Sequence, residues 1–317
     1  MVPLTRSSFV TAGLAALAGP ALAATTPPPL TTIRIGESAN VDVSSVIWQV
    51  QNGIFQRLGL NIEGQRLTTG SAATAAVIGG SLDIAAASIF GLMLAHLKGI
   101  PIVLQSVQAV YDSAHPATAF VVAKDSPITT PAQLNGATIS TAALGDLFSN
   151  ATAAWVDQNG GNSKTLNFIE LPVPSAATAI AAGRVGGALL VEPFLQDGID
   201  RGQIRILGYP YNMIAPRFGI TYYFCTQSYA TSSADVLARF RRGLAQQATY
   251  ALAHKSEIYA LAAKVSGASL ETVQHIPFLV SAGLDVRIIQ PVIEYAAKYK
   301  FIPRSFPASE LVDPNAV

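Results

Sequence analysis

The sequence predicts an α/β protein built as two doubly wound α/β lobes, joined by two crossover segments. Short apolar strand patterns alternate with helical patterns from residue 32 onward, which is the element order of an open parallel sheet. The same order returns 104 residues later. Half of the 317 residues are hydrophobic and only 12% are charged, so the chain can bury a large core.

The first set of elements begins with a β pattern at 32–36. An apolar helical spacing then runs from Val46 to Leu58 and stops at a glycine, which is a common helix end. Residues 60–63 alternate apolar and polar side chains as a strand does. A turn at 68–71 opens an Ala-rich helix, and the apolar run at 82–87 follows it as a buried strand.

The second set repeats the first at an offset of 104 residues. Ser71-Ala-Ala-Thr-Ala matches Ser175-Ala-Ala-Thr-Ala, and the same offset places Ile35 on Ile139. The repeat predicts a second lobe at 120–217. Its expected strands are 137–141, 166–171 and 187–191.

The rest of the chain is predicted to be mainly helical. The helical patterns cover 233–254, 256–266, 269–275 and 285–299. We expect these helices to pack on the first lobe, which would then comprise 32–119 plus 218–317. Chain crossings between the lobes are expected near 111–119 and 208–219.

Residues 1–24 have the features of a cleaved export signal. Arg6 is their only charge, an apolar run covers 9–18, and Ala21-Leu22-Ala23 fits a peptidase site. The run is too short to cross a bilayer. We therefore expect cleavage near Ala23 or Ala24, a linker at 25–31, and a periplasmic protein whose export route, Sec or twin-arginine, stays open.

Charge and motif content exclude several functions. Removing residues 1–23 removes one of 20 basic residues and none of the 19 acidic ones, so the mature charge is zero and favours no nucleic acid. Cys225 is the only cysteine, the four histidines lack metal-ligand spacing, and no nucleophile elbow or phosphate-binding loop occurs. We expect no enzyme activity, no metal and no cofactor, and a monomer.

An ordered set of short motifs covers roughly residues 32–225. The set comprises Gly53-Ile54-Phe55, Leu58-Gly59-Leu60-Asn61-Ile62, Thr69-Gly70-Ser71, Gly80-Ser81-Leu82-Asp83-Ile84-Ala85, Lys98-Gly99-Ile100-Pro101-Ile102, Val122-Ala123-Lys124-Asp125-Ser126, Pro131-Ala132-Gln133-Leu134-Asn135-Gly136 and Val191-Glu192-Pro193-Phe194. Through these motifs the chain resembles the nitrate/sulfonate/taurine and thiamine-precursor family of ABC-transporter substrate-binding proteins, which have the type II periplasmic-binding fold. It departs from the family at Val185-Gly186-Gly187, where relatives often have Asp-Ala-Ala, and at Glu37, near a position where they often have an aromatic residue.

The resemblance implies a small-molecule ligand between the lobes and delivery to an ABC permease, which would be the chain's only link to a membrane. Two alternatives stay open: a periplasmic enzyme on the same fold, and a ligand-sensing binding protein. Thiamine-pyrimidine synthases on this fold would call for a Cys-rich motif and a catalytic histidine, which the sequence lacks.

Ligands of open parallel sheets bind at the carboxyl ends of the strands, where helix N-termini present free N–H groups. The residues that we expect there are Glu37, Ser38, Asn40, Thr68, Thr69, Gly70, Ser71, Ser88, Thr141, Asp146, Glu192 and Tyr222.

Several of these residues have a structural interpretation beside the ligand-binding one. Thr69, Ser71 and Ser88 suit helix caps. Glu192 suits a carboxylate that complements its own helix, and Tyr222 suits the core. The expected lining contains three carboxylates and no Arg or Lys, which favours a ligand with a cationic group or a neutral polar one.

Overall fold

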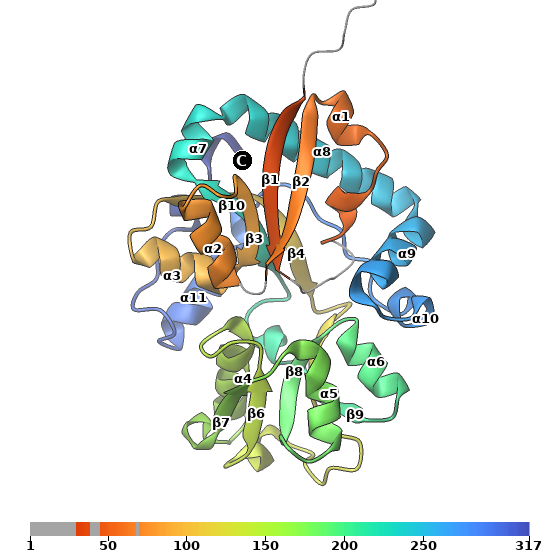
Figure 1. Ribbon diagram of the computed structural model, residues 1–317. Helices are drawn as coiled ribbons and strands as arrows, with labels where there is room; N and C mark the ends of the chain where they lie inside the picture. The colour runs from red at the N-terminus through yellow and green to blue at the C-terminus, as the bar shows by residue number, and fades with distance from the viewer. Residues whose placement is uncertain (1–29, 39–44, 68–69, 317) are drawn as a thin grey trace, which may run out of the picture.

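The computed structural model describes residues 30–38, 45–67 and 70–316. Two five-stranded sheets, each flanked by helices, form two lobes that lie one above the other in Figure 1. This arrangement confirms the predicted fold class. The predicted signal peptide and most of the linker lie outside the described residues.

The first sheet, in the upper lobe of Figure 1, has the strand order β2-β1-β3-β10-β4. Its strands β1, β2 and β3 are parallel, and β10 pairs antiparallel with both β3 and β4. The bounds are β1 Thr31–Ser38, β2 Leu60–Leu67, β3 Ile84–Ser88, β4 Ile102–Asp112 and β10 Arg217–Thr226.

The second sheet has the order β7-β6-β8-β5-β9. Strands β6, β7 and β8 are parallel, and β5 runs antiparallel to both β8 and β9. The bounds are β5 Thr118–Ala123, β6 Thr138–Thr141, β7 Asn167–Glu170, β8 Gly187–Val191 and β9 Ile204–Gly208.

The offset of 104 residues carries elements of the first lobe onto equivalent elements of the second. It places β1 on β6, β2 on β7 and β3 on β8, and these strands occupy the same positions in the two sheet orders. It also carries the Ala-rich helix Gly70–Ile78 onto Val173–Ala181. The internal repeat therefore corresponds to a shared topology.

Helices cover the sheets and fill the ends of the lobes. The α-helices are α1 Ile54–Arg57, α2 Gly70–Ile78, α3 Ile89–Leu97, α4 Leu147–Gln158, α5 Val173–Ala181, α6 Phe194–Asp200, α7 Gln227–Ser232, α8 Ala234–Ala253, α9 Lys255–Ser266, α10 Leu270–Gln274 and α11 Gln290–Lys298. The 3-10 helices are η1 Ile47–Gln49, η2 Pro131–Leu134, η3 Ser163–Thr165, η4 Pro210–Met213, η5 Val286–Ile288, η6 Ala308–Glu310 and η7 Pro314–Ala316. Among the residues that the structure describes, no helix has the length and apolar character needed to span a membrane.

The continuous helix predicted from Val46 to Leu58 is wrong. The chain makes one 3-10 turn, leaves the helical region at Val50 (φ −67°, ψ 119°) and re-enters it after Gly53, whose φ of 75° is left-handed. A glycine adopts that conformation without steric cost. The side chain of Asn52 then accepts the N–H of Ile54 at 3.1 Å, so the second piece starts as a separate short helix.

Two connectors join the lobes, residues 113–117 between β4 and β5 and residues 209–216 between β9 and β10. Aromatic side chains pack where the connectors meet. The ring of Tyr211 lies 5.3 Å from that of Tyr111 and 5.5 Å from that of Phe218, measured between centroids, and all three side chains are buried. This cluster fixes the ends of both connectors.

The carboxyl ends of the parallel strands in each sheet face the other lobe (Figure 1). On one side of the junction, α6 of the second lobe contacts α10, which packs with the first lobe. The side chains that follow β1, β3, β6 and β8 are therefore brought to the region between the lobes.

Candidate functional site

Glu37 lies near the carboxyl end of β1 and is 6% exposed. Its Oε1 atom accepts hydrogen bonds from Gln108 Nε2 at 2.8 Å and from the hydroxyl of Tyr223 at 3.1 Å. Gln108 comes from β4 and Tyr223 from β10. Three strands thus hold this carboxylate in place, as burial of a charge requires.

Arg66 stands beside Glu37 on the neighbouring strand. The two residues are register partners in the parallel β1–β2 pair. Arg66 is exposed, and its guanidinium donates to the carbonyl of Val265 at 3.5 Å. The sequence argument, which expected no basic residue at this edge, did not include Arg66.

Thr141 and Asp146 are brought together at the start of α4. Asp146 Oδ1 accepts the hydroxyl of Thr141 at 2.8 Å and the backbone N–H of Ser149 at 2.8 Å, while its Oδ2 accepts the N–H of Ala143 at 3.2 Å. Burial raises the pKa of Asp146, and these hydrogen bonds oppose that rise. Asp146 is therefore the N-cap of α4, and a further role toward a ligand stays a prediction.

Glu192 follows β8 directly and is 7% exposed. Its Oε2 atom accepts the backbone N–H of Gln196 at 3.0 Å, in the first turn of α6. Burial raises the pKa of Glu192 to about 7, and the carboxylate of Asp200 adds to the rise, whereas the Gln196 N–H and His275 oppose it. A buried acid whose pKa lies near neutrality is a candidate functional group.

His275 brings the first lobe close to Glu192. It caps the C-terminus of α10, and α10 contacts α6 across the junction. His275 also lowers the pKa of Glu192, against the larger effect of burial. Glu192 therefore faces the first lobe as well as its own helix.

Ser88 occupies the position in the first lobe that corresponds to Glu192. It is the last residue of β3 and the N-cap of α3, without a side-chain capping hydrogen bond. Gly70 and Ser71 begin α2, and Ser71 is exposed. These three residues lie at the first lobe's edge, as expected, and their contact with a ligand stays a prediction.

Tyr222 lies in β10 with its side chain fully buried in the core of the first lobe. Burial raises the pKa of its hydroxyl, which has no hydrogen-bond partner among the described residues. Asn40, Thr68 and Thr69 lie outside the described residues, and so does the side chain of Ser38.

Sequence reasoning missed Gln108, Tyr223, Arg66 and His275. A signal existed for Gln108, because a glutamine inside an otherwise apolar buried strand needs a polar partner. Tyr223 carried no comparable signal. The part of the chain that the structure describes holds no cluster of His, Cys, Asp or Glu suited to a metal ion.

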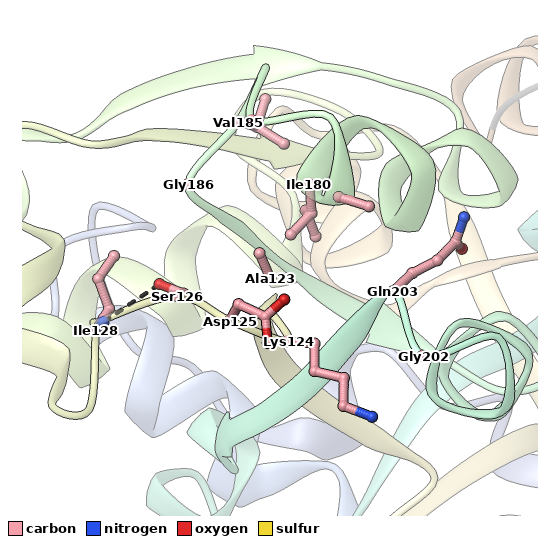
Figure 2. Close-up of a pocket in the computed structure, with 12 residues that line it drawn as sticks. Ala123, Lys124, Asp125, Ser126, Ile128, Ile180, Val185, Gly186, Gly202 and Gln203 are labelled. Carbon is pink, nitrogen blue, oxygen red and sulfur yellow. Dashed lines mark hydrogen bonds between the residues drawn. The ribbon is translucent and has the colours of Figure 1, made fainter.

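A surface pocket of about 500 Å³ lies on the second lobe, away from these residues. Figure 2 shows Lys124, Asp125 and Gln203 around it, with Ile180 and Val185 on its apolar side. Gly186 at its wall precedes β8, whereas Glu192 follows that strand. The pocket and Glu192 therefore sit at opposite ends of β8, roughly 20 Å apart.

Residues 40–258 match the protein family described as NMT1/THI5 like. This match covers more than half of the chain. The chain belongs to this family. No curated protein sequence matches it.

The solved structures that share the fold include two binding proteins and an enzyme. The alkanesulfonate-binding protein SsuA from Xanthomonas axonopodis pv. citri, bound to MOPS, is 18% identical with a TM-score of 0.73 over 90% of this chain and 99% of that one. The periplasmic nitrate-binding protein NrtA from Synechocystis PCC 6803 is 12% identical, with a TM-score of 0.73 over 90% and 86% of the two chains. The desulfurization enzyme DSZB is 12% identical, with a TM-score of 0.65 over 89% and 96%.

At these identities the structural likeness establishes the fold alone. Together with the family match, it confirms the resemblance to the nitrate/sulfonate/taurine group that the sequence motifs indicate. The fold neighbours thus include two proteins named for the solutes that they bind and one named as an enzyme.

Proposed function

We propose that this protein is an exported solute-binding protein, which captures a small polar organic molecule between its two lobes and delivers it to an ABC permease. The observation that carries the proposal is the arrangement of the strand ends. Equivalent strands of the two lobes point their carboxyl ends at each other (Figure 1), and they bring Glu37 from one lobe and Glu192 from the other to the junction. Such strand ends are where open α/β sheets bind ligands.

The connection between the lobes supports capture by closure. Among the described residues, two connectors, 113–117 and 209–216, link the two sheets, and hinges of this kind absorb domain closure around ligands. We propose lobe boundaries at 32–119 plus 218–317 and at 120–217. The neighbours SsuA and NrtA are named as sulfonate-binding and nitrate-binding proteins, which supports a binding role on this fold.

The remaining parts of the proposal concern the cell. The leader pattern in residues 1–24 supports export to the periplasm with removal of the leader near Ala23 or Ala24. The partner would be an ABC permease, and the mature chain would act as a monomer. The likeness to binding proteins of import systems supports the permease.

A solute screen combined with solution scattering tests this function. The mature protein is melted with sulfonates, amines, pyrimidines and aromatic acids, and free solute at a thousand times its Kd adds about 4 kcal/mol of stability. A chain of this size then melts several degrees higher. We expect each solute that raises the melting temperature also to decrease the radius of gyration. If no solute does both, the proposal is wrong.

An enzyme on the same fold is the second candidate, and DSZB is the observation that favours it. The single cysteine, Cys225, is buried, and burial raises the pKa of its thiol to about 12, which makes it a poor nucleophile. Chemical change of a bound solute during incubation with purified protein would favour the enzyme. Recovery of unchanged solute favours binding.

A further inference from the structure

The carboxyl ends of the strands carry more acids than bases. Glu37 lies near the end of β1, Glu170 ends β7, and Asp146 and Glu192 lie in the segments that follow β6 and β8. Two basic residues lie at the same edge: Arg66 on β2, and Arg217, which begins the antiparallel β10 and pairs with Asp112 at the end of β4 at 3.5 Å. The edge that faces the other lobe therefore carries a negative field, which disfavours a free anion there.

Glu192 is the acid with the greatest remaining capacity to bind. Glu37 is held by two side-chain donors and Asp146 by its own helix, as described above. Glu170 accepts the N–H of Leu144 at 2.8 Å and is exposed. In Glu192, Oε2 takes the N–H of Gln196, while Oε1 has no hydrogen-bond partner among the described residues.

The segments around Glu192 carry few basic groups: the connector whose Ala117 carbonyl accepts the N–H of Glu192 contains His115, and Arg201 of α6 pairs with Asp197. On its own helix it faces Asp200, which is also an acid, and α10 contributes His275 together with Glu271. Helix α5 and strand β8, which pack against α6, contain no titratable side chain. Strand β9 contributes Arg205, whose guanidinium donates hydrogen bonds to the backbone carbonyls of Ser126, at 2.9 Å, and of Ile128.

We propose that Glu192 holds a cationic nitrogen of the solute, so that this protein takes small molecules bearing an amine, amidine or guanidine rather than free sulfonate or nitrate. The inference rests on the solute-binding function proposed above. The solute's cationic nitrogen would donate a charge-assisted hydrogen bond to Oε1, which has no hydrogen-bond partner among the described residues. Ser88, at the equivalent position of the first lobe, would offer the solute only a neutral hydroxyl.

The protonation of Glu192 supports this assignment. Because burial raises its pKa to about 7, the empty protein carries a mixture of acid and carboxylate near neutral pH. A bound cation stabilises the carboxylate and displaces the proton. Binding of a cation should therefore strengthen as the pH rises from about 6 to about 8.

The test uses probes that share a skeleton and differ in charge. Propylamine and benzylamine are compared with propanesulfonate and benzenesulfonate, at equal concentration, in thermal-shift and calorimetric titrations. We expect the amines to bind, with higher affinity at the higher pH. In Glu192→Gln, which keeps the shape and removes the charge, amine affinity should fall roughly 10-fold to 100-fold.

Asp197→Asn is the matched control, because it removes a carboxylate from the same helix where that carboxylate pairs with Arg201 at 2.9 Å. This variant should bind the amines as the wild type does. The inference is overturned if the sulfonates bind as tightly as the amines, if amine affinity is unchanged in Glu192→Gln, or if no amine binds. In each case another solute that binds and closes the lobes would leave the solute-binding function standing, whereas failure of that function leaves no solute bound.

Discussion

Replacing Glu192 by glutamine should stabilise the empty protein at alkaline pH. The folded protein raises the pKa of this acid from 4.5 to about 7. Through this range the folded chain keeps a proton that the unfolded chain has lost, so the free energy of unfolding decreases as the pH rises and has lost about 3 kcal/mol above the folded pKa. Glutamine carries no charge and still offers an oxygen to the Gln196 N–H, so it avoids this loss.

Urea unfolding of the wild type and Glu192→Gln, followed by circular dichroism at about pH 5 and about pH 8, measures the effect. We expect similar stability at the lower pH and a gain of up to about 3 kcal/mol for the variant at the higher pH. Asp197→Asn loses only an exposed ion pair and should cost under about 1 kcal/mol. If Glu192→Gln is no more stable than the wild type at the higher pH, the carboxylate is not destabilised by burial.

Three other substitutions test the packing at the connectors and a part-buried ion pair. Tyr111→Phe removes a hydroxyl that donates to Asn212 at 2.6 Å and should lower the free energy of unfolding by about 1 kcal/mol. Tyr211→Phe removes a buried hydroxyl without a partner among the described residues and should leave the free energy of unfolding unchanged or raise it. Equal losses for the two variants in unfolding titrations would contradict this. Asp313→Ala should cost about 3 to 5 kcal/mol, because it leaves the part-buried Arg241, 3.6 Å away, without its ion partner. A loss under about 1 kcal/mol would contradict that role.

Much of the fold was predictable because periodicity and repetition are local properties of the sequence. The offset of 104 residues identified equivalent strands, and the structure places them at equivalent sheet positions. The strand β10 was not predicted, although aromatic and branched residues dominate Phe218 to Phe224. Its place between β3 and β4 depends on a long-range return of the chain from the second lobe, which local patterns do not encode.

The candidate site was less predictable than the fold. The rule that ligands bind at strand ends identified Glu37 and Glu192 as candidate site residues, because each lies near a strand end that can be recognised in the sequence. It did not reveal that Gln108 and Tyr223 hold Glu37, since these residues are about 70 and 190 positions away along the chain. Nor did it separate Asp146, whose oxygens are used by its own helix, from Glu192, which keeps one free.

Burial makes the Glu192 carboxylate destabilise the empty protein, and the same carboxylate is proposed to stabilise the complex by binding a cation. If the carboxylate only complemented α6, replacing it by glutamine would shift stability by the same amount with and without an amine. If it binds a cation, the variant should be the more stable protein when empty and should lose about 1.4 to 2.7 kcal/mol of the stabilisation that a saturating amine adds. The advantage of the variant should therefore shrink or reverse as propylamine is added. A helix cap alone gives no reason for such a change, so melting curves of the two proteins across an amine titration separate the two roles.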